Sequence, residues 1–182
     1  MKPIAYVAAA ALLLSPLAST MAGEQVTAQA TAELRNAQGE PIGTATLVEG
    51  HAGVIIKLQV SKLPAGPHGL HIHAVGRCDP PDFMSAGTHF NPLGKKHGQQ
   101  NPEGTHAGDL PNLQVGADGT AHVEVPAALV TLAEGPHSLF PPAGAAGVPG
   151  GTALVIHEAP DDDITDPDGK AGARLACGVI TK

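Results

Sequence analysis

The sequence of 182 residues has no Trp, one Tyr and three Phe, and its ten Lys and Arg are outnumbered by seventeen Asp and Glu. The resulting net charge is −7, and the few basic residues form no cluster. Nucleic-acid binding relies on basic patches and on aromatic side chains that stack with bases. The composition therefore argues against nucleic acid, and against an anionic membrane surface, as a partner.

The chain also has only one hydrophobic run, Ile4–Leu14, which follows Lys2 and ends at a Ser-Pro pair. This run is too short to span a bilayer, and small residues follow it, which is the pattern of a secretory signal peptide. We expect residues 1–22 to be this signal, with cleavage after Ala22. A membrane anchor is the alternative. Residues 23–182 are then expected to form one exported domain without a membrane anchor.

Cysteine is nearly absent, since Cys78 and Cys177 are the only two. In an exported protein two cysteines most simply form one disulfide, although free or metal-bound thiols are the alternative. A Cys78–Cys177 bridge would close a loop of about 100 residues, worth roughly 4–5 kcal/mol in the chain-entropy account of disulfide stabilisation.

No helical apolar stripe occurs after the first 22 residues, and 23 Gly and 17 Pro favour frequent turns. Strand signals dominate instead: apolar and polar residues alternate in short segments, for example Ala28, Ala30, Ala32 and Leu34 in one and Val54, Ile56, Leu58 and Val60 in another. Seven segments of this kind occur, at 25–35, 42–50, 53–63, 69–75, 120–126, 151–159 and 174–181. They predict an all-β antiparallel sandwich or barrel with long irregular loops at 76–109, 135–151 and 158–173.

Three of the histidines on predicted strands are candidate metal ligands. His71 and His73 form an H-x-H pair, and strand alternation places both imidazoles on one face, which suggests a shared metal. His157, on another strand, is a third candidate or a structural histidine. Three imidazoles suit copper or zinc, with a preference for copper, and zinc with a bound water would instead indicate a lyase or hydrolase. Residue types alone leave these alternatives open.

A second set lies in the polar loop 88–109, where His89, His97, His106 and Asp109 follow one another at offsets of 8, 9 and 3 residues. Three imidazoles and one carboxylate make a closed tetrahedral set for Zn²⁺, and closed sites are structural. Such a zinc would order the loop. The alternative is a solvated His-rich loop with loose metal affinity.

Five blocks of the sequence, in this order, resemble the signature blocks of the copper,zinc superoxide dismutases: "GPHGLHIHAVGRC", "AGTHFNPLGKKHG", "THAGDLPNL", "VIHEAPDD" and "GARLACGVI". The resemblance covers nearly all of residues 23–182. It implies a Greek-key β-barrel or sandwich of about eight strands that dismutates superoxide to oxygen and hydrogen peroxide by a redox-cycling copper.

The resemblance also implies roles for individual residues. Four histidines would bind one copper, namely His71, His73, His89 and His157. One zinc would be bound by His89, His97, His106 and Asp109. His89 would then bridge both metals and supply a proton during turnover. Arg174 would guide the anion above the copper, Asp161 would hydrogen-bond a copper histidine and a zinc histidine together, and Cys78 and Cys177 would form the disulfide.

Two features resemble the exported bacterial branch of this family and so predict a periplasmic location. The stretch between Cys78 and His89 is long, and the loop 158–173 is short, with Lys170 as its single base. A homodimer is compatible with the resemblance. Lys95, Lys96 and Lys170 are candidates for steering the substrate. The four histidines outside the blocks' ligand positions are not expected to bind metal at the site: His51, His68, His122 and His137.

Two other classes of function are alternatives to a dismutase. A non-catalytic copper or zinc carrier on the same scaffold has no need of Arg174, so the match of this arginine together with the whole ligand set disfavours it. A mononuclear zinc hydrolase lacks a convincing general base near His71 and His73.

Overall fold

The computed structural model describes residues 28–141 and 150–182. The predicted signal peptide, residues 1–22, lies outside this range, as does the middle of the loop predicted at 135–151. Nine strands occur in the described residues: β1 (Gln29–Asn36), β2 (Pro41–Gly50), β3 (Gly53–Val60), β4 (Gly66–His68), β5 (Leu70–His73), β6 (Leu113–Val115), β7 (Ala121–Ala127), β8 (Ala153–His157) and β9 (Arg174–Val179).

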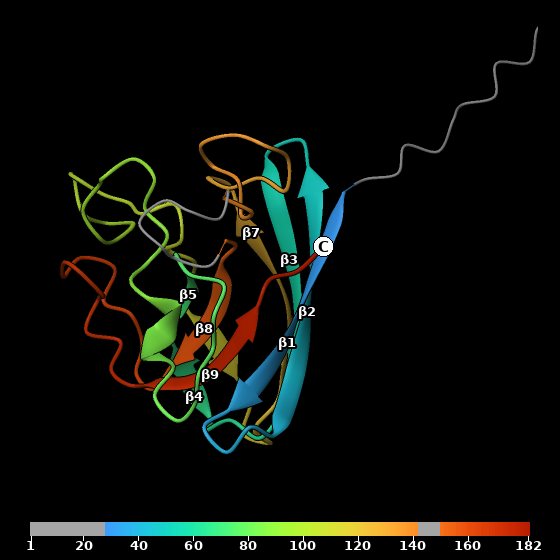
Figure 1. Ribbon diagram of the computed structural model, residues 1–182. Coiled ribbons are helices and arrows are strands. Elements are labelled where there is room, and N and C mark those ends of the chain that lie inside the picture. Colours follow the sequence, from blue (N-terminus) through green and yellow to red (C-terminus); the bar gives the residue numbers. More distant parts are fainter. Residues whose placement is uncertain (1–27, 142–149) are drawn as a thin grey trace, which may run out of the picture.

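Seven strands form one curled antiparallel sheet in the order β5-β8-β9-β1-β2-β3-β7 (Figure 1). Strands β1, β2 and β3 follow one another as a meander, whereas β9, the last strand in the chain, returns to pair with β1. A late strand that comes back beside the first is the Greek-key arrangement. The predicted fold class, an all-β Greek-key barrel or sandwich, is therefore confirmed.

The seven segments predicted from alternation are the seven strands of this sheet. On β3 the side chains of Val54, Ile56, Leu58 and Val60 are buried, as the alternation predicts. Ala28 is the exception, because it precedes β1 and is exposed rather than part of the buried face. The three-residue strands β4 and β6, which pair with each other, were missed because three residues are too few to show a period.

The core lies between the two halves of the curled sheet. Leu34, Leu47 and Ile56 from the long strands are fully buried, and so are Ile72 and Ile156 from β5 and β8. The described helical structure is one 3₁₀ turn, η1 (Met84–Ala86). Within residues 28–141 and 150–182, no helix combines the length and the apolar character that a membrane crossing requires.

Strand β5 is at the edge of the sheet, and the polar loop 88–109 covers that edge. The Ile72 N–H donates to Gly108 O at 2.9 Å, and the Phe90 N–H donates to Ile72 O at 2.8 Å. Gly108 is needed here, because a Cβ at this position would lie 2.2 Å from Ile72 O. Backbone hydrogen bonds to a buried strand, with Phe90 anchored in the core, thus fix the loop.

The disulfide predicted between Cys78 and Cys177 is present, with the two Cα atoms 5.7 Å apart. Cys177 lies on β9 and packs in a small apolar cluster with Phe83 and Val155. The bridge therefore fastens the loop that follows β5 to the last strand. Figure 1 shows that loop 76–109 and loop 158–173 both project from the side of the sheet formed by β5 and β8.

Candidate metal centre

A first group of four buried histidines gathers beside β5 and β8: His71, His73, His89 and His157. His71 and His73 alternate on β5, and His157 ends the neighbouring strand β8. The fourth, His89, comes from loop 88–109 and is placed by a bridge between its backbone and that of His73. One ligand atom from each of the four lies within 4.8 Å of the others.

In each histidine of this group, one ring nitrogen makes a hydrogen bond to the protein. His73 Nδ1 donates to Gly87 O at 2.9 Å, and His157 Nδ1 donates to Gly172 O at 3.2 Å. Their Nε2 atoms then face each other at 3.3 Å. Engaging one nitrogen by a hydrogen bond fixes the ring and leaves the second nitrogen as a metal ligand.

The other two histidines of this group, His71 and His89, provide a test of whether a metal fits. His71 Nδ1 and His89 Nε2 are buried and have no hydrogen-bond partner among the described residues. Buried polar atoms are normally satisfied, so such atoms require an explanation. A cation bound by the four free imidazole nitrogens would satisfy both atoms, and the residues therefore fit a copper or zinc ion.

A second group consists of three histidines and one carboxylate: His89, His97, His106 and Asp109. Asp109 Oδ1 lies 2.9 Å from His89 Nδ1 and 3.1 Å from the Nδ1 atoms of both His97 and His106. His106 and Asp109 belong to one turn, since the His106 N–H donates to Asp109 Oδ2. This group is a closed four-ligand set of the kind that suits a structural Zn²⁺.

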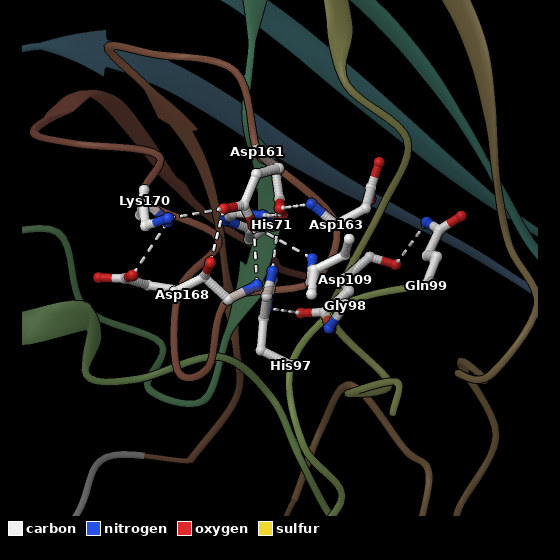
Figure 2. Close-up of polar contacts among 12 residues, drawn as sticks. His71, His97, Gly98, Gln99, Asp109, Asp161, Asp163, Asp168 and Lys170 are labelled. Carbon is white, nitrogen blue, oxygen red and sulfur yellow. Dashed lines mark hydrogen bonds and ion pairs between the residues drawn. The ribbon is translucent and has the colours of Figure 1, made fainter. Parts of the chain in front are cut away.

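Asp161 joins the two groups (Figure 2). Its Oδ2 lies 2.6 Å from His71 Nε2, and its Oδ1 lies 3.0 Å from His97 Nε2. In the run of three aspartates, Asp161 is the buried one, whereas Asp162 is exposed and accepts hydrogen bonds from Thr165. Of the three adjacent aspartates, Asp161 is therefore the one that contacts a histidine of each group.

Burial lowers the pKa of three histidines in the first group. It lowers the pKa of His89 to about 4 and that of His157 to about 3, and in both cases the charge of His71 adds to the effect. Burial also lowers the pKa of His73 well below its usual value. These imidazoles are therefore neutral near pH 7, with a lone pair available to a metal.

The pKa of His97 is shifted in the opposite direction. Burial acts to lower its pKa, but hydrogen bonds to Asp109 and Asp161 outweigh burial and raise the pKa to about 10. Burial likewise opposes ionisation of the two carboxyls, but hydrogen bonds from histidines hold the pKa values of both below the usual range. Without metal, His97 is a cation between two carboxylates, so a metal that binds its Nδ1 must displace a proton.

A pocket of about 530 Å³ opens onto the first group. Its lining includes His73, His89 and His157 together with Arg174, which pairs with His157 across the β8–β9 ladder. The Arg174 guanidinium donates to Phe83 O and to Gly87 O, each at 2.6 Å. Burial lowers the pKa of Arg174 and the charge of Asp82 opposes this, but a guanidinium stays charged in proteins.

The other histidines lie outside the metal groups found in the described residues. His68 is buried, and both of its ring nitrogens contact backbone oxygens, His157 O at 2.8 Å and Pro64 O at 2.9 Å. His51, His122 and His137 are at or near the surface. Of the lysines considered for steering, Lys96 pairs with Asp166 and Lys170 pairs with Asp162, which offsets their charges.

Sequence reasoning missed two residues that hold the site's loops together. Asp166 accepts the backbone N–H of His97 at 2.9 Å and the ammonium of Lys96 at 3.1 Å. Asn112 makes two hydrogen bonds to the backbone of Asp161. Both are polar residues in irregular segments, and their partners lie 49 or more residues away, so no local spacing could have indicated them.

Comparison with known proteins agrees with this geometry. Superoxide dismutase [Cu-Zn] 1 of Aquifex aeolicus (strain VF5) is 51% identical over 151 residues, which is 82% of this chain and 85% of that protein. The crystal structure of a SOD-like protein from Bacillus subtilis has a TM-score of 0.76 at 40% identity, covering 81% of this chain and 95% of that one. The Cu/Zn superoxide dismutase from Brucella abortus has a TM-score of 0.63 at 31% identity, and the match covers 84% of this chain and 99% of that one.

The sequence profile described as copper/zinc superoxide dismutase (SODC) matches residues 41–180, which is most of the chain. This match and the 51% identity to a named enzyme are mutually consistent. The chain thus belongs to the copper/zinc superoxide dismutase family, whose enzymes are oxidoreductases that use copper and zinc.

Proposed function

We propose that this protein dismutates superoxide with one copper in the first histidine group and one zinc in the second. The copper ligands are His71, His73, His89 and His157, and the zinc ligands are His89, His97, His106 and Asp109. The observation that carries the proposal is the position of His89. Its Nδ1 lies 2.9 Å from Asp109 Oδ1 in the second group, while its buried Nε2 has no partner among the described residues.

Copper, when bound, supplies the one-electron redox chemistry by which one superoxide becomes oxygen and another becomes peroxide. The chain contributes imidazoles whose orientation is fixed in advance by hydrogen bonds to Gly87 O, Gly172 O and Asp161. Fixing the ligands before the reaction avoids reorganisation during it. The second group has no open position and orders loop 88–109.

His89 is the proposed proton carrier. Its Nδ1 belongs to the zinc group, and its Nε2 belongs to the group that lines the pocket, where the residue is 5% exposed. A proton taken up at Nε2 is therefore next to the place where peroxide forms, within reach of a bound anion.

Arg174 is the proposed docking group for the anion. It is the one Lys or Arg among the described residues that line this pocket, and the carbonyls of Phe83 and Gly87 fix its guanidinium beside His157. A fixed positive charge beside the reacting group stabilises an anion that docks there.

Residues 1–22 are proposed to direct export to the periplasm, as their composition predicts. The disulfide supports this location, because disulfides persist mainly in oxidising compartments. Protein recovered from a periplasmic extract of a Gram-negative host should begin at or within a few residues of Gly23, as amino-terminal sequencing would show. Recovery of an intact Met1 from the membrane fraction would contradict the proposal.

The enzyme assignment is tested by metal analysis together with a superoxide-removal assay. The purified, metal-loaded protein should contain one copper and one zinc per chain and should consume superoxide, because the proposed ligand sets and docking arginine supply what the reaction needs. If the protein holds both metals in this ratio and leaves superoxide untouched, the assignment as an enzyme is wrong and that of a metal carrier is favoured.

The shared histidine is tested by His89→Ala. With Co²⁺ substituted for zinc, a bridging imidazole should couple the two metals and suppress the copper signal in electron paramagnetic resonance. His89→Ala should restore that signal, whereas the control His122→Ala, an exposed histidine outside both groups, should leave it suppressed. An equally suppressed signal in His89→Ala would exclude this residue as the bridge.

The docking role is tested by Arg174→Ala. We expect kcat/KM for superoxide to fall by roughly tenfold, equivalent to about 1.4 kcal/mol, because a charge that stabilises the docked anion is lost. Azide affinity, followed by optical titration, should fall with it while both metals remain bound. Arg77→Ala is the control, since Arg77 is exposed, pairs with Asp79 and lies outside the pocket. Loss of copper in Arg174→Ala would mean that the role is misassigned.

A further inference from the structure

Asn112 and Asp161 form a reciprocal pair of hydrogen bonds. Asn112 Nδ2 donates to Asp161 O at 2.9 Å, and the Asp161 N–H donates to Asn112 Oδ1 at 2.8 Å. One amide side chain thus satisfies both backbone polar groups of Asp161. Asn112 lies three residues after Asp109, a member of the second group, and directly before strand β6. The pair therefore connects the end of the histidine-rich loop to the loop 158–173.

The carboxylate of Asp161 has little freedom. Oδ2 contacts His71, and Oδ1 contacts both His97 and the backbone N–H of Asp163. Gly169 closes over it, because a Cβ on Gly169 would lie 1.9 Å from Asp161 Oδ1 and 2.7 Å from His97 Nε2. Gly169 also has a φ of +65°, which favours glycine. Asn112 fixes the backbone of Asp161, and the packing against Gly169 confines its carboxylate.

We propose that Asn112 is a positioning residue that couples the zinc group to the copper group through Asp161. The inference rests on the metal assignment proposed above. A cation bound by Asp109 fixes the segment 109–112, and Asn112 passes this constraint to the backbone of Asp161. Asp161 then holds His71 Nε2, so that Nδ1 of the same ring is directed at the copper group.

The coupling is reciprocal, because a ligand that raises the affinity of a second ligand is itself bound more tightly when the second is present. Asn112 acts in parallel with His89, which belongs to both groups directly. Loss of Asn112 is therefore expected to remove part of the coupling rather than all of it.

The chemistry of the side chain explains why an asparagine serves here. The contact needs one donor and one acceptor at a fixed separation, which an amide provides and a carboxylate does not. Asn101 offers a matched comparison: its Nδ2 donates to Ile164 O at 3.2 Å, which joins the same two loops without touching Asp161. Removing either asparagine weakens the contact between the loops. Only the removal of Asn112, however, frees the backbone of Asp161.

The experiment measures copper affinity, by competition with a chelator, in zinc-free and zinc-loaded protein. The coupling factor is the ratio of the two affinities. Zinc should raise copper affinity in the unmodified protein, and Asn112→Ala should reduce the coupling factor by about fivefold or more, the lower end of typical coupling between sites. Asn101→Ala should keep the factor of the unmodified protein. These readouts need no turnover, so they are independent of whether the protein dismutates superoxide.

A double-mutant cycle separates positioning from a general loss of structure. In the Asp161→Asn background, Asn112→Ala should cause no further fall in the coupling factor, because the two residues act in series. Asn112→Asp is the second variant, for use if Asn112→Ala folds poorly. It keeps the acceptor and loses the donor, so its coupling factor should lie between those of the unmodified protein and Asn112→Ala. Three results would overturn the inference: no effect of zinc on copper affinity in the unmodified protein, equal factors for Asn112→Ala and Asn101→Ala, or additive effects of Asn112 and Asp161.

Discussion

The two carboxylates Asp109 and Asp161 set the constraint on which the rest of the site depends. Asp109 Oδ1 lies within 3.1 Å of three ring nitrogens, and Asp161 contacts a histidine of each group. Buried charges are costly unless they are paired, and here the partners are imidazoles that belong to the two groups. The side of the barrel that carries β5 and β8 is therefore arranged around two places where cations fit.

The scaffold meets this constraint with little apolar burial from the loops themselves. The loop 88–109 is too polar to fold by burial, yet it adds backbone hydrogen bonds to the free edge of β5 and places Phe90 in the core. Covering the edge also removes a row of unpaired backbone groups that could pair with another chain. The same contacts thus protect the sheet and position His89.

The sequence could predict the parts of this arrangement that have a local period or spacing. Alternation located the seven strands of the main sheet, the H-x-H pair placed His71 and His73 on one face, and the disulfide followed from the two cysteines. The pair Asn112–Asp161 spans 49 residues, and the contact of His97 with Asp166 spans 69, so both depend on how the loops fold against each other. Strands of three residues, such as β4 and β6, are likewise decided by tertiary pairing.

The Cys78–Cys177 bridge supports some residues of the site and not others. His71, His73 and His157 lie on hydrogen-bonded strands, and their positions do not depend on a covalent link. Arg174 is different, because its guanidinium is held by the carbonyls of Phe83 and Gly87 in the loop that the bridge fastens to β9. The three strand histidines are placed by strand pairing alone, whereas the bridge gives covalent support to the loop whose carbonyls hold the Arg174 guanidinium. A chain with reduced cysteines would therefore keep these strand histidines in place but lack one support of Arg174, the docking group proposed for the anion.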